Sequence, residues 1–260
     1  MKYRLLWDVH THTAYSHGSG SIEDNVRAAA AKGLLAVGIA DHGIGHAFFG
    51  MKEEKVAEMR SEIVRLRGLY PDMTILLGTE ANIIDRDGTI DLPAADPLDY
   101  IVAGYHFGAF GKEPARALAL GLVNRFVPAH GKGWERVRKA NTDRVLAALY
   151  TNDIRVLSHP GAKAPVDLMA VGVACRERGT LMELNAKHLS LNADEIRKLK
   201  DLGVTFCIGS DAHRPEDVGR LEEPLRIAAD AGLRPEQIVN VIPIDADPKK
   251  GDLPEWMSSL

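Results

Sequence analysis

Three histidines lie close together near the N-terminus, in residues 7–17, WDVHTHTAYSH. His10 and His12 are two residues apart, and His17 follows five residues later. Neutral imidazole is the commonest metal ligand among protein side chains. Because residues i and i+2 of a strand point to the same side, His10 and His12 could bind a single ion together. The spacing therefore predicts one wall of a metal site.

The other walls are predicted by side chains that follow short apolar segments further along the chain. They are Asp41 and His42 in IADH, Glu80 in LLGTE, His106 in AGYH, His159 in VLSHP, and Asp211 and His213 in CIGSDAH. A single histidine in such a place is more often a hydrogen-bonded polar residue than a ligand. Seven of the ten histidines of the chain nevertheless follow this pattern, together with Glu80 and Asp211, so coincidence explains it poorly.

The residue types indicate which ions such a site would bind. Imidazole and carboxylate together suit Zn²⁺, Mn²⁺ or Fe, and the lack of cysteine at these positions argues against a closed structural zinc site. His46, His130 and His188 do not follow the pattern. We expect them in loops or at the surface, with contact to substrate as the alternative.

The elements that must position these side chains are seven short segments dense in Val, Ile and Leu, as expected of strands buried on both faces of a parallel sheet. They are residues 4–9, 34–40, 73–78, 100–105, 154–158, 180–185 and 204–209. Amphipathic helices are predicted at residues 21–32, 52–69, 134–150, 166–178 and 192–202. This alternation predicts one closed or nearly closed α/β barrel, and an open doubly wound sheet is the alternative.

A barrel would bring the candidate ligands together, because the C-terminal ends of parallel strands share one face, where barrel active sites lie. Six of the seven predicted strands deliver a possible ligand to that face. The irregular residues 107–132 are too long for an ordinary loop, so we expect a lid or a binding loop there.

Composition limits the class of protein. The chain has 260 residues, 45% of them hydrophobic, with a net charge of -4, so we expect one globular domain over residues 1–260. The acidic balance argues against long nucleic acid as a partner but permits a small anionic substrate. Cys175 and Cys207 lie in apolar contexts and are expected to be free, buried thiols. With no signal-like or membrane-spanning segment, we expect a soluble cytoplasmic protein, and its oligomeric state stays open.

The order of the motifs resembles that of the PHP (polymerase and histidinol phosphatase) family. The matching residues are HTHT at 10–13, followed by His17, then ADH at 40–42, GTE at 78–80, His106, SHPG at 158–161 and SDAH at 210–213. The resemblance implies a distorted (β/α)7, TIM-like barrel. The stretch GTEANIIDRDGTIDLP at 78–93 is similar to stand-alone, phosphatase-like members of the family.

The resemblance also implies a site with three divalent metal ions. One ion would be bound by His10, His12, Glu80 and Asp211, a second by Glu80, His106 and His159, and the third by His17, His42 and His213. Asp41 would orient a ligand histidine. Glu183 and Asn185, on the one strand without a ligand, would support the site from behind.

The reaction implied is hydrolysis of a small phosphate monoester, such as histidinol phosphate or a nucleotide, through a metal-bound hydroxide. Glu80, Asp211 and His213 would be the catalytic residues, and Asp211 could also accept the proton of water. Arg86, Lys187 and Arg214 are candidates for binding the substrate. The alternatives are a C–N hydrolase of the amidohydrolase type, a nuclease acting on nucleotide ends, and a metal-binding regulatory module without turnover.

Overall fold

Seven parallel strands form a nearly closed barrel in the computed structural model, which describes residues 2–94, 98–111, 118, 121–124, 126 and 130–258. The strands, in sheet order, are β2 (Trp7–Thr11), β3 (Ala36–Ile39), β4 (Thr74–Asn82), β5 (Tyr100–Gly104), β6 (Val156–Leu157), β7 (Leu181–Asn185) and β8 (Phe206–Gly209). Beyond the ends of β2 and β8, the amide of His12 donates to the carbonyl of Ala212 at 2.8 Å. The predicted barrel is confirmed, and the open sheet is wrong.

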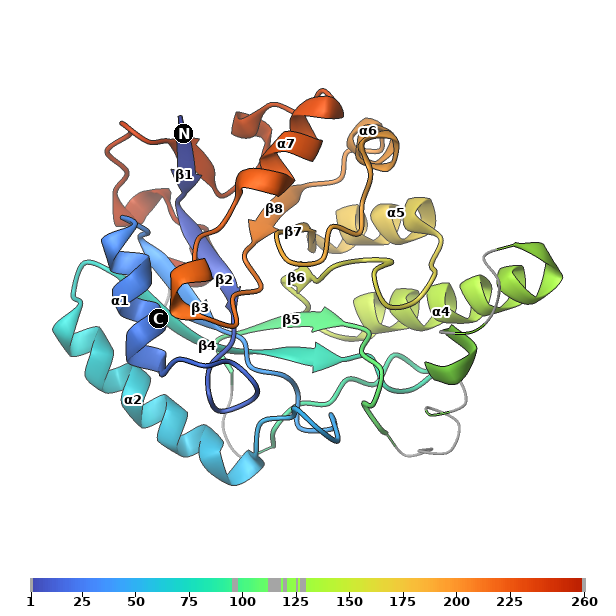
Figure 1. Cartoon of the computed structure of the whole chain (residues 1–260), viewed down its shortest axis with the longest axis horizontal. Coiled ribbons are helices and arrows are strands. Elements are labelled where there is room, and N and C mark those ends of the chain that lie inside the picture. The colour runs from blue at the N-terminus through green and yellow to red at the C-terminus, as the bar shows by residue number, and fades with distance from the viewer. Residues whose placement is uncertain are drawn as a thin grey trace.

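Helices cover the outside of the barrel (Figure 1). They are α1 (Ile22–Ala31), α2 (Val56–Leu69), α4 (Gly131–Thr151), α5 (Leu168–Arg178), α6 (Ala193–Asp201) and α7 (Glu222–Asp230), with 3-10 turns η1 (Glu53–Lys55), η2 (Pro215–Asp217), η3 (Pro235–Gln237) and η4 (Lys250–Asp252). The short α8 (Glu255–Ser258) instead packs against the inner core of the barrel. All five predicted helices are confirmed. Two of them begin as their sequences dictate, because Ser21 and Asn192 each form a capping box at the first turn.

Side chains along each strand alternate between the outside and the inside of the barrel, and they form one apolar core on each side. Residues such as Val37, Ile75 and Leu77 pack outward against the helices, whereas Trp7, Leu76 and Tyr100 belong to a second cluster of inward-facing side chains. On β4 the inward positions continue from Leu76 to Glu80, since side chains repeat every two residues. The same alternation that fills the barrel with apolar groups thus points Glu80 into its C-terminal mouth.

The first predicted strand is wrong in one respect. Residues 4–9 form two strands, because the chain breaks at Leu6, and β1 (Tyr3–Leu5) leaves the barrel to pair antiparallel with β9 (Val241–Pro243). Asn240 holds this break in place, since its side chain donates to the carbonyl of Trp7 at 2.9 Å and its carbonyl accepts from the amide of Leu6 at 2.8 Å.

The lid predicted over residues 107–132 lies partly outside the described residues. Within it, residues 107–111, 118, 121–124, 126 and 130–132 are described, and α4 begins at Gly131. Among the residues that the structure describes, no helix has both the length and the apolar character that crossing a bilayer requires.

Candidate metal centre

The C-terminal strand ends surround a cavity of about 280 Å³. The side chains that line it are His17, His42, His46, Phe49, Glu80, His106, Phe107, His159, Lys163, Lys187, His188, Asp211 and His213. His10 and His12 are fully buried in contact with Glu80. The structure therefore brings together all nine residues that the sequence pattern and the family resemblance single out as ligands.

Glu80 lies at the centre of this group. Its two carboxylate oxygens face five imidazole nitrogens, His10 Nε2 at 3.3 Å, His12 Nε2 at 3.6 Å, His42 Nδ1 at 3.0 Å, His106 Nε2 at 3.3 Å and His159 Nε2 at 2.9 Å. A buried carboxylate beside several imidazoles offers a cation a negative charge and nitrogen donors at one place.

Asp211 forms a second point of convergence. Its Oδ1 lies 3.4 Å from His12 Nε2, 3.3 Å from His213 Nδ1 and 4.0 Å from His10 Nε2. The backbone of Asp211 has φ 51°, and that of His159 has φ 27°. These are the two non-glycine residues with positive φ in the described chain. Left-handed backbone is unfavourable for most L-residues and concentrates at functional sites.

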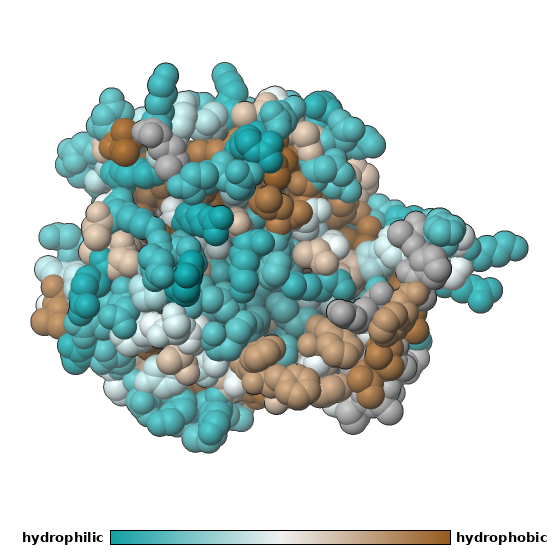
Figure 2. Space-filling view, in the orientation of Figure 1, coloured by the Kyte–Doolittle hydropathy of each residue, from teal (hydrophilic) through white to brown (hydrophobic). Residues whose placement is uncertain are grey.

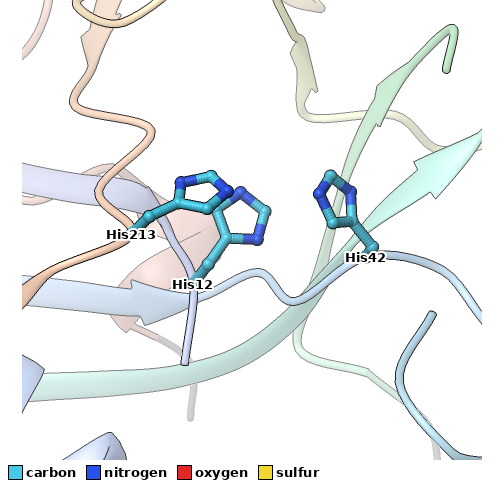
Figure 3. A group of neighbouring side chains, drawn as sticks. All are labelled: His12, His42 and His213. Carbon is cyan, nitrogen blue, oxygen red and sulfur yellow. The ribbon is translucent and has the colours of Figure 1, made fainter. Parts of the chain in front are cut away.

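The structure contains three groups of three residues in which the possible ligand atoms all lie within 4.8 Å of one another. The groups are His12, His42 and His213; His10, His12 and Asp211; and His42, Glu80 and His106. Figure 3 shows the first of these groups, in which the rings of His12 and His213 lie side by side and that of His42 lies across from them. The second group lies within the set that the family resemblance gives to one ion. The other two groups mix residues that the resemblance gives to different ions. The structure therefore agrees with the set of ligands that the resemblance implies, but less well with the way the resemblance divides them among three ions.

Unpaired nitrogens test whether metal ions fit here. His10 Nε2, both ring nitrogens of His12 and His42 Nδ1 are buried and have no hydrogen-bond partner in the structure. A buried polar atom without a partner is unfavourable by about 1–3 kcal/mol. Cations coordinated by these nitrogens would remove that penalty, so the donor set fits divalent metal ions.

The charges of the site favour the metal-binding protonation states of several groups. Burial opposes ionisation of Glu80, but attraction to the neighbouring histidines holds the pKa of Glu80 well below its usual value, and His10, whose own pKa is raised well above the usual value, is the cationic partner among them. Burial, reinforced by neighbouring histidines, lowers the pKa of His17 and of His106 to about 3. Ionised carboxylate and neutral imidazole are the forms that coordinate metal.

Strand β7 supports the site from behind, as the sequence indicates. Glu183 Oε1 lies 2.6 Å from His10 Nδ1, and Glu183 Oε2 accepts from the backbone amide of His159 at 2.9 Å. Asn185 donates to Glu183 at 2.8 Å and to Asp211 at 3.1 Å. A carboxylate behind a ligand imidazole fixes its orientation and raises its basicity.

Asp41 contacts a loop rather than the imidazoles for which it was predicted. Its carboxylate accepts from the amide of Thr13 at 2.8 Å, from the hydroxyl of Thr13 at 2.6 Å and from the hydroxyl of Ser16. Thr13 and Ser16 lie between His12 and His17 in the chain. Asp41 therefore holds the segment that carries these two histidines.

The three candidate substrate-binding cations occupy different places. Lys187 lines the cavity, with Nζ 2.8 Å from His213 Nδ1 and 3.8 Å from Asp211 Oδ1. Arg214 pairs with Asp217 at 3.2 Å and with Glu216 at 3.6 Å, and neither Arg214 nor Arg86 is among the described residues that line the cavity. Lys163 does line it. It was missed, although its place two residues after the SHPG turn puts a cation at a strand end.

Two of the three unassigned histidines also line the cavity, His46 and His188. His130 is exposed and lies at the N-cap of α4. Aromatic side chains form part of the rim: the ring of Phe49 stacks on that of His17 at 4.4 Å between centroids, and Phe107 is 47% exposed. On the face shown in Figure 2, a band of hydrophobic side chains lies at the lower right, beside the hydrophilic ones that fill the centre.

Comparisons with known proteins show the family of this chain and a solved structure of similar fold. A probable phosphatase of Caldanaerobacter subterraneus is 31% identical over 92% of this chain and 89% of that protein, and the probable phosphatase YcdX of Escherichia coli is 30% identical over 91% of this chain and 90% of that protein. The histidinol phosphate phosphatase of Lactococcus lactis, crystallised with zinc, L-histidinol and phosphate, superposes with a TM-score of 0.57 at 16% identity, covering 88% of this chain and 94% of that one. Residues 8–202 match the family model described as the PHP domain. The chain belongs to the PHP domain family.

Proposed function

We propose that this protein is a metal-dependent phosphatase that hydrolyses a small phosphate monoester at the cavity formed by the C-terminal strand ends. The observation that carries the proposal is the buried Glu80 carboxylate with five imidazole nitrogens within 3.6 Å, several of which have no hydrogen-bond partner. The names of its relatives support the same activity, since both curated relatives reported above are named probable phosphatases.

Three divalent ions are proposed for the site, with Glu80 as the shared ligand. His10, His12 and Asp211 would hold one ion, His106 and His159 another, and His17, His42 and His213 the third. Zn²⁺, Mn²⁺ and Fe²⁺ all suit imidazole and carboxylate. Zinc is supported further by the Lactococcus lactis structure, which contains it.

Bound divalent ions would supply two things, positive charge for the phosphoryl oxygens and a lowered pKa of water. The protein residues supply the rest. Asp211 lines the cavity as an ionised carboxylate, because the effects of His10 and His12 outweigh that of burial and hold its pKa well below the usual value. This low pKa suits Asp211 to binding a cation and makes it a weak acceptor for the proton of water. Lys187 and Lys163 add positive charge on the wall where a phosphate group would lie.

The size of the cavity supports a small substrate. A volume of about 280 Å³ is enough for a phosphate group and a compact leaving group. Histidinol phosphate and a nucleotide remain the two named candidates, the first supported by the ligands of the Lactococcus lactis structure.

The test is phosphate release by the purified protein from p-nitrophenyl phosphate, histidinol phosphate and a set of nucleotides, with and without a chelator. We expect release that stops on chelation and returns with Zn²⁺ or Mn²⁺. His10→Ala and Asp211→Ala should each lower kcat by more than about 100-fold, beyond the loss typical of residues behind the ligands, whereas His130→Ala should have no effect. Metal-loaded protein that releases no phosphate from any of these compounds would contradict the proposal.

A further inference from the structure

Asp91 is a buried carboxylate that belongs to no predicted ligand position. It is 6% exposed and lies in the segment that returns toward the barrel after the turn at Gly88. Its carboxylate accepts from the backbone amide and the side-chain amide of Asn82, the latter at 2.6 Å, and from the amide of Gly45 at 2.8 Å. Three donors thus converge on one buried acceptor.

These contacts determine which way the Asn82 side chain points. An ionised carboxylate can only accept, so the NH₂ group of Asn82 must face Asp91 and its Oδ1 must face the other way. On that other side, Asn82 Oδ1 lies 2.8 Å from His106 Nδ1. An amide oxygen can only accept, so Nδ1 of His106 carries the ring proton.

The consequence reaches the centre of the site. With its proton on Nδ1, neutral His106 presents a lone pair at Nε2, which lies 3.3 Å from Glu80 and 3.1 Å from His159 Nε2. The opposite tautomer would place a hydrogen at Nε2 and block coordination there.

The same carboxylate also fixes the loop that follows β3. The amide of Gly45 donates to Asp91, and a Cβ added at Gly43 would overlap the Asp91 carboxylate. The backbone of the loop therefore lies directly against this carboxylate. Gly43 directly follows His42, and His46 follows Gly45. Asp91 therefore contacts the loop that carries His42 and His46, and through Asn82 it reaches a third histidine of the cavity, His106.

We propose that Asp91 is a positioning residue that, through Asn82, sets the tautomer of His106 and leaves its Nε2 free for a metal ion. This inference rests on the proposed function only in taking His106 as a ligand.

The test replaces Asp91 with an amide. In Asp91→Asn a single oxygen must serve three donors, so Asn82 is no longer held in one orientation. We expect the Nε2-protonated tautomer of His106 to become populated in metal-free protein, measured by ¹⁵N NMR of the histidine rings with His106→Gln as the assignment control. Metal affinity should fall by about 10–100-fold. Asp87→Asn, the same change at an exposed position of the same segment, should alter neither.

The swapped variant Asn82→Asp/Asp91→Asn decides between positioning and general damage. It places the carboxylate beside His106 and an NH₂ donor opposite it, so the Nδ1-protonated tautomer and the metal affinity should return. Wild-type tautomers in Asp91→Asn would overturn the proposal. If Asp91→Asn does not fold, the swapped variant alone decides. A swapped variant that is also unfolded, or in which His106 carries its proton on Nε2, would overturn the proposal. Because the NMR test uses metal-free protein, it is independent of phosphate release, whose absence would contradict only the proposed function.

Discussion

At the scale of single residues, the site combines two kinds of buried group. Glu80 and Asp211 are carboxylates kept ionised by their histidines, and His12 and His42 keep ring nitrogens without hydrogen-bond partners. Burial of a carboxylate is unfavourable unless an opposite charge compensates it, and burial of a ring nitrogen is unfavourable unless the nitrogen has a partner. The arrangement makes sense as a set of ligands whose missing partners are cations.

Lys187 and Arg214 offer a matched pair for testing which cation binds the substrate. Lys187→Met removes a charge from the wall of the cavity, so KM for p-nitrophenyl phosphate should rise about tenfold, which corresponds to about 1.4 kcal/mol of binding free energy. Arg214→Met removes a charge that is already paired with Asp217 outside the cavity, so KM should stay within about twofold. Steady-state kinetics on both variants, with metal content measured in parallel, check this prediction. Equal effects of the two changes would contradict it.

At the scale of elements, the strands position the site by their registers and by their close packing. On β8, a Cβ at Gly209 would overlap Glu183 Oε1 and lie 3.1 Å from the Cβ of His10. Neighbouring strands therefore have room for the contact between Glu183 and His10 only because Gly209 has no side chain. The residue is part of the site although it has no group that could act chemically.

Gly209→Ala should therefore displace Glu183 and weaken metal binding by about 10–100-fold, as loss of a group behind a ligand does. Gly68→Ala is the control, because nothing lies within 4 Å of a Cβ there, and alanine in helix α2 should stabilise the fold by about 1 kcal/mol. Metal titration and urea unfolding of both variants give the two quantities. Unchanged metal affinity in Gly209→Ala would show that Glu183 is dispensable.

The sequence predicts those elements whose signal is local. Buried parallel strands are short apolar runs, and the capping residues Ser21 and Asn192 mark helix starts, so seven strands and five helices were found. β1 and β9 were missed because each has three residues and is defined by pairing across the whole chain. The partners of Asp41 were missed for a related reason, since loop contacts depend on the fold and leave no periodic pattern. Lys163 differs, because its place after the SHPG turn is a local signal.

At the scale of the whole molecule, the residues of the candidate site lie at the C-terminal end of the barrel, and residues that stabilise the fold lie at the opposite end, as in other barrels of this kind. The C-terminal ends carry the polar cavity. On the apolar inner core, the ring of Trp256 from α8 packs edge-on against Trp7 at 6.3 Å and lies 5.8 Å from that of Tyr100, and Met257 is buried with them. Changes in this packing should alter stability without altering the site.

Met257→Ala should lower the free energy of unfolding by about 2–5 kcal/mol, the usual loss for a large-to-small change in a core. Metal content and kcat per folded molecule should remain as in the wild type. Leu69→Ala, at an exposed position that ends α2, should change the free energy by no more than about 0.5 kcal/mol. Urea unfolding of metal-free protein measures both, and loss of metal in Met257→Ala would mean that the two ends are coupled.

The central claim is that Glu80 and the histidines around it hold divalent metal ions, and metal content tests it most directly. The measurement is elemental analysis of freshly purified protein, beside Glu80→Gln, which keeps the shape of the side chain but removes its charge. We expect two to three ions per chain in the wild type and fewer than one in Glu80→Gln, with both proteins folded. A wild type that binds no metal even after reconstitution, or a Glu80→Gln protein that keeps the full complement, would contradict the account.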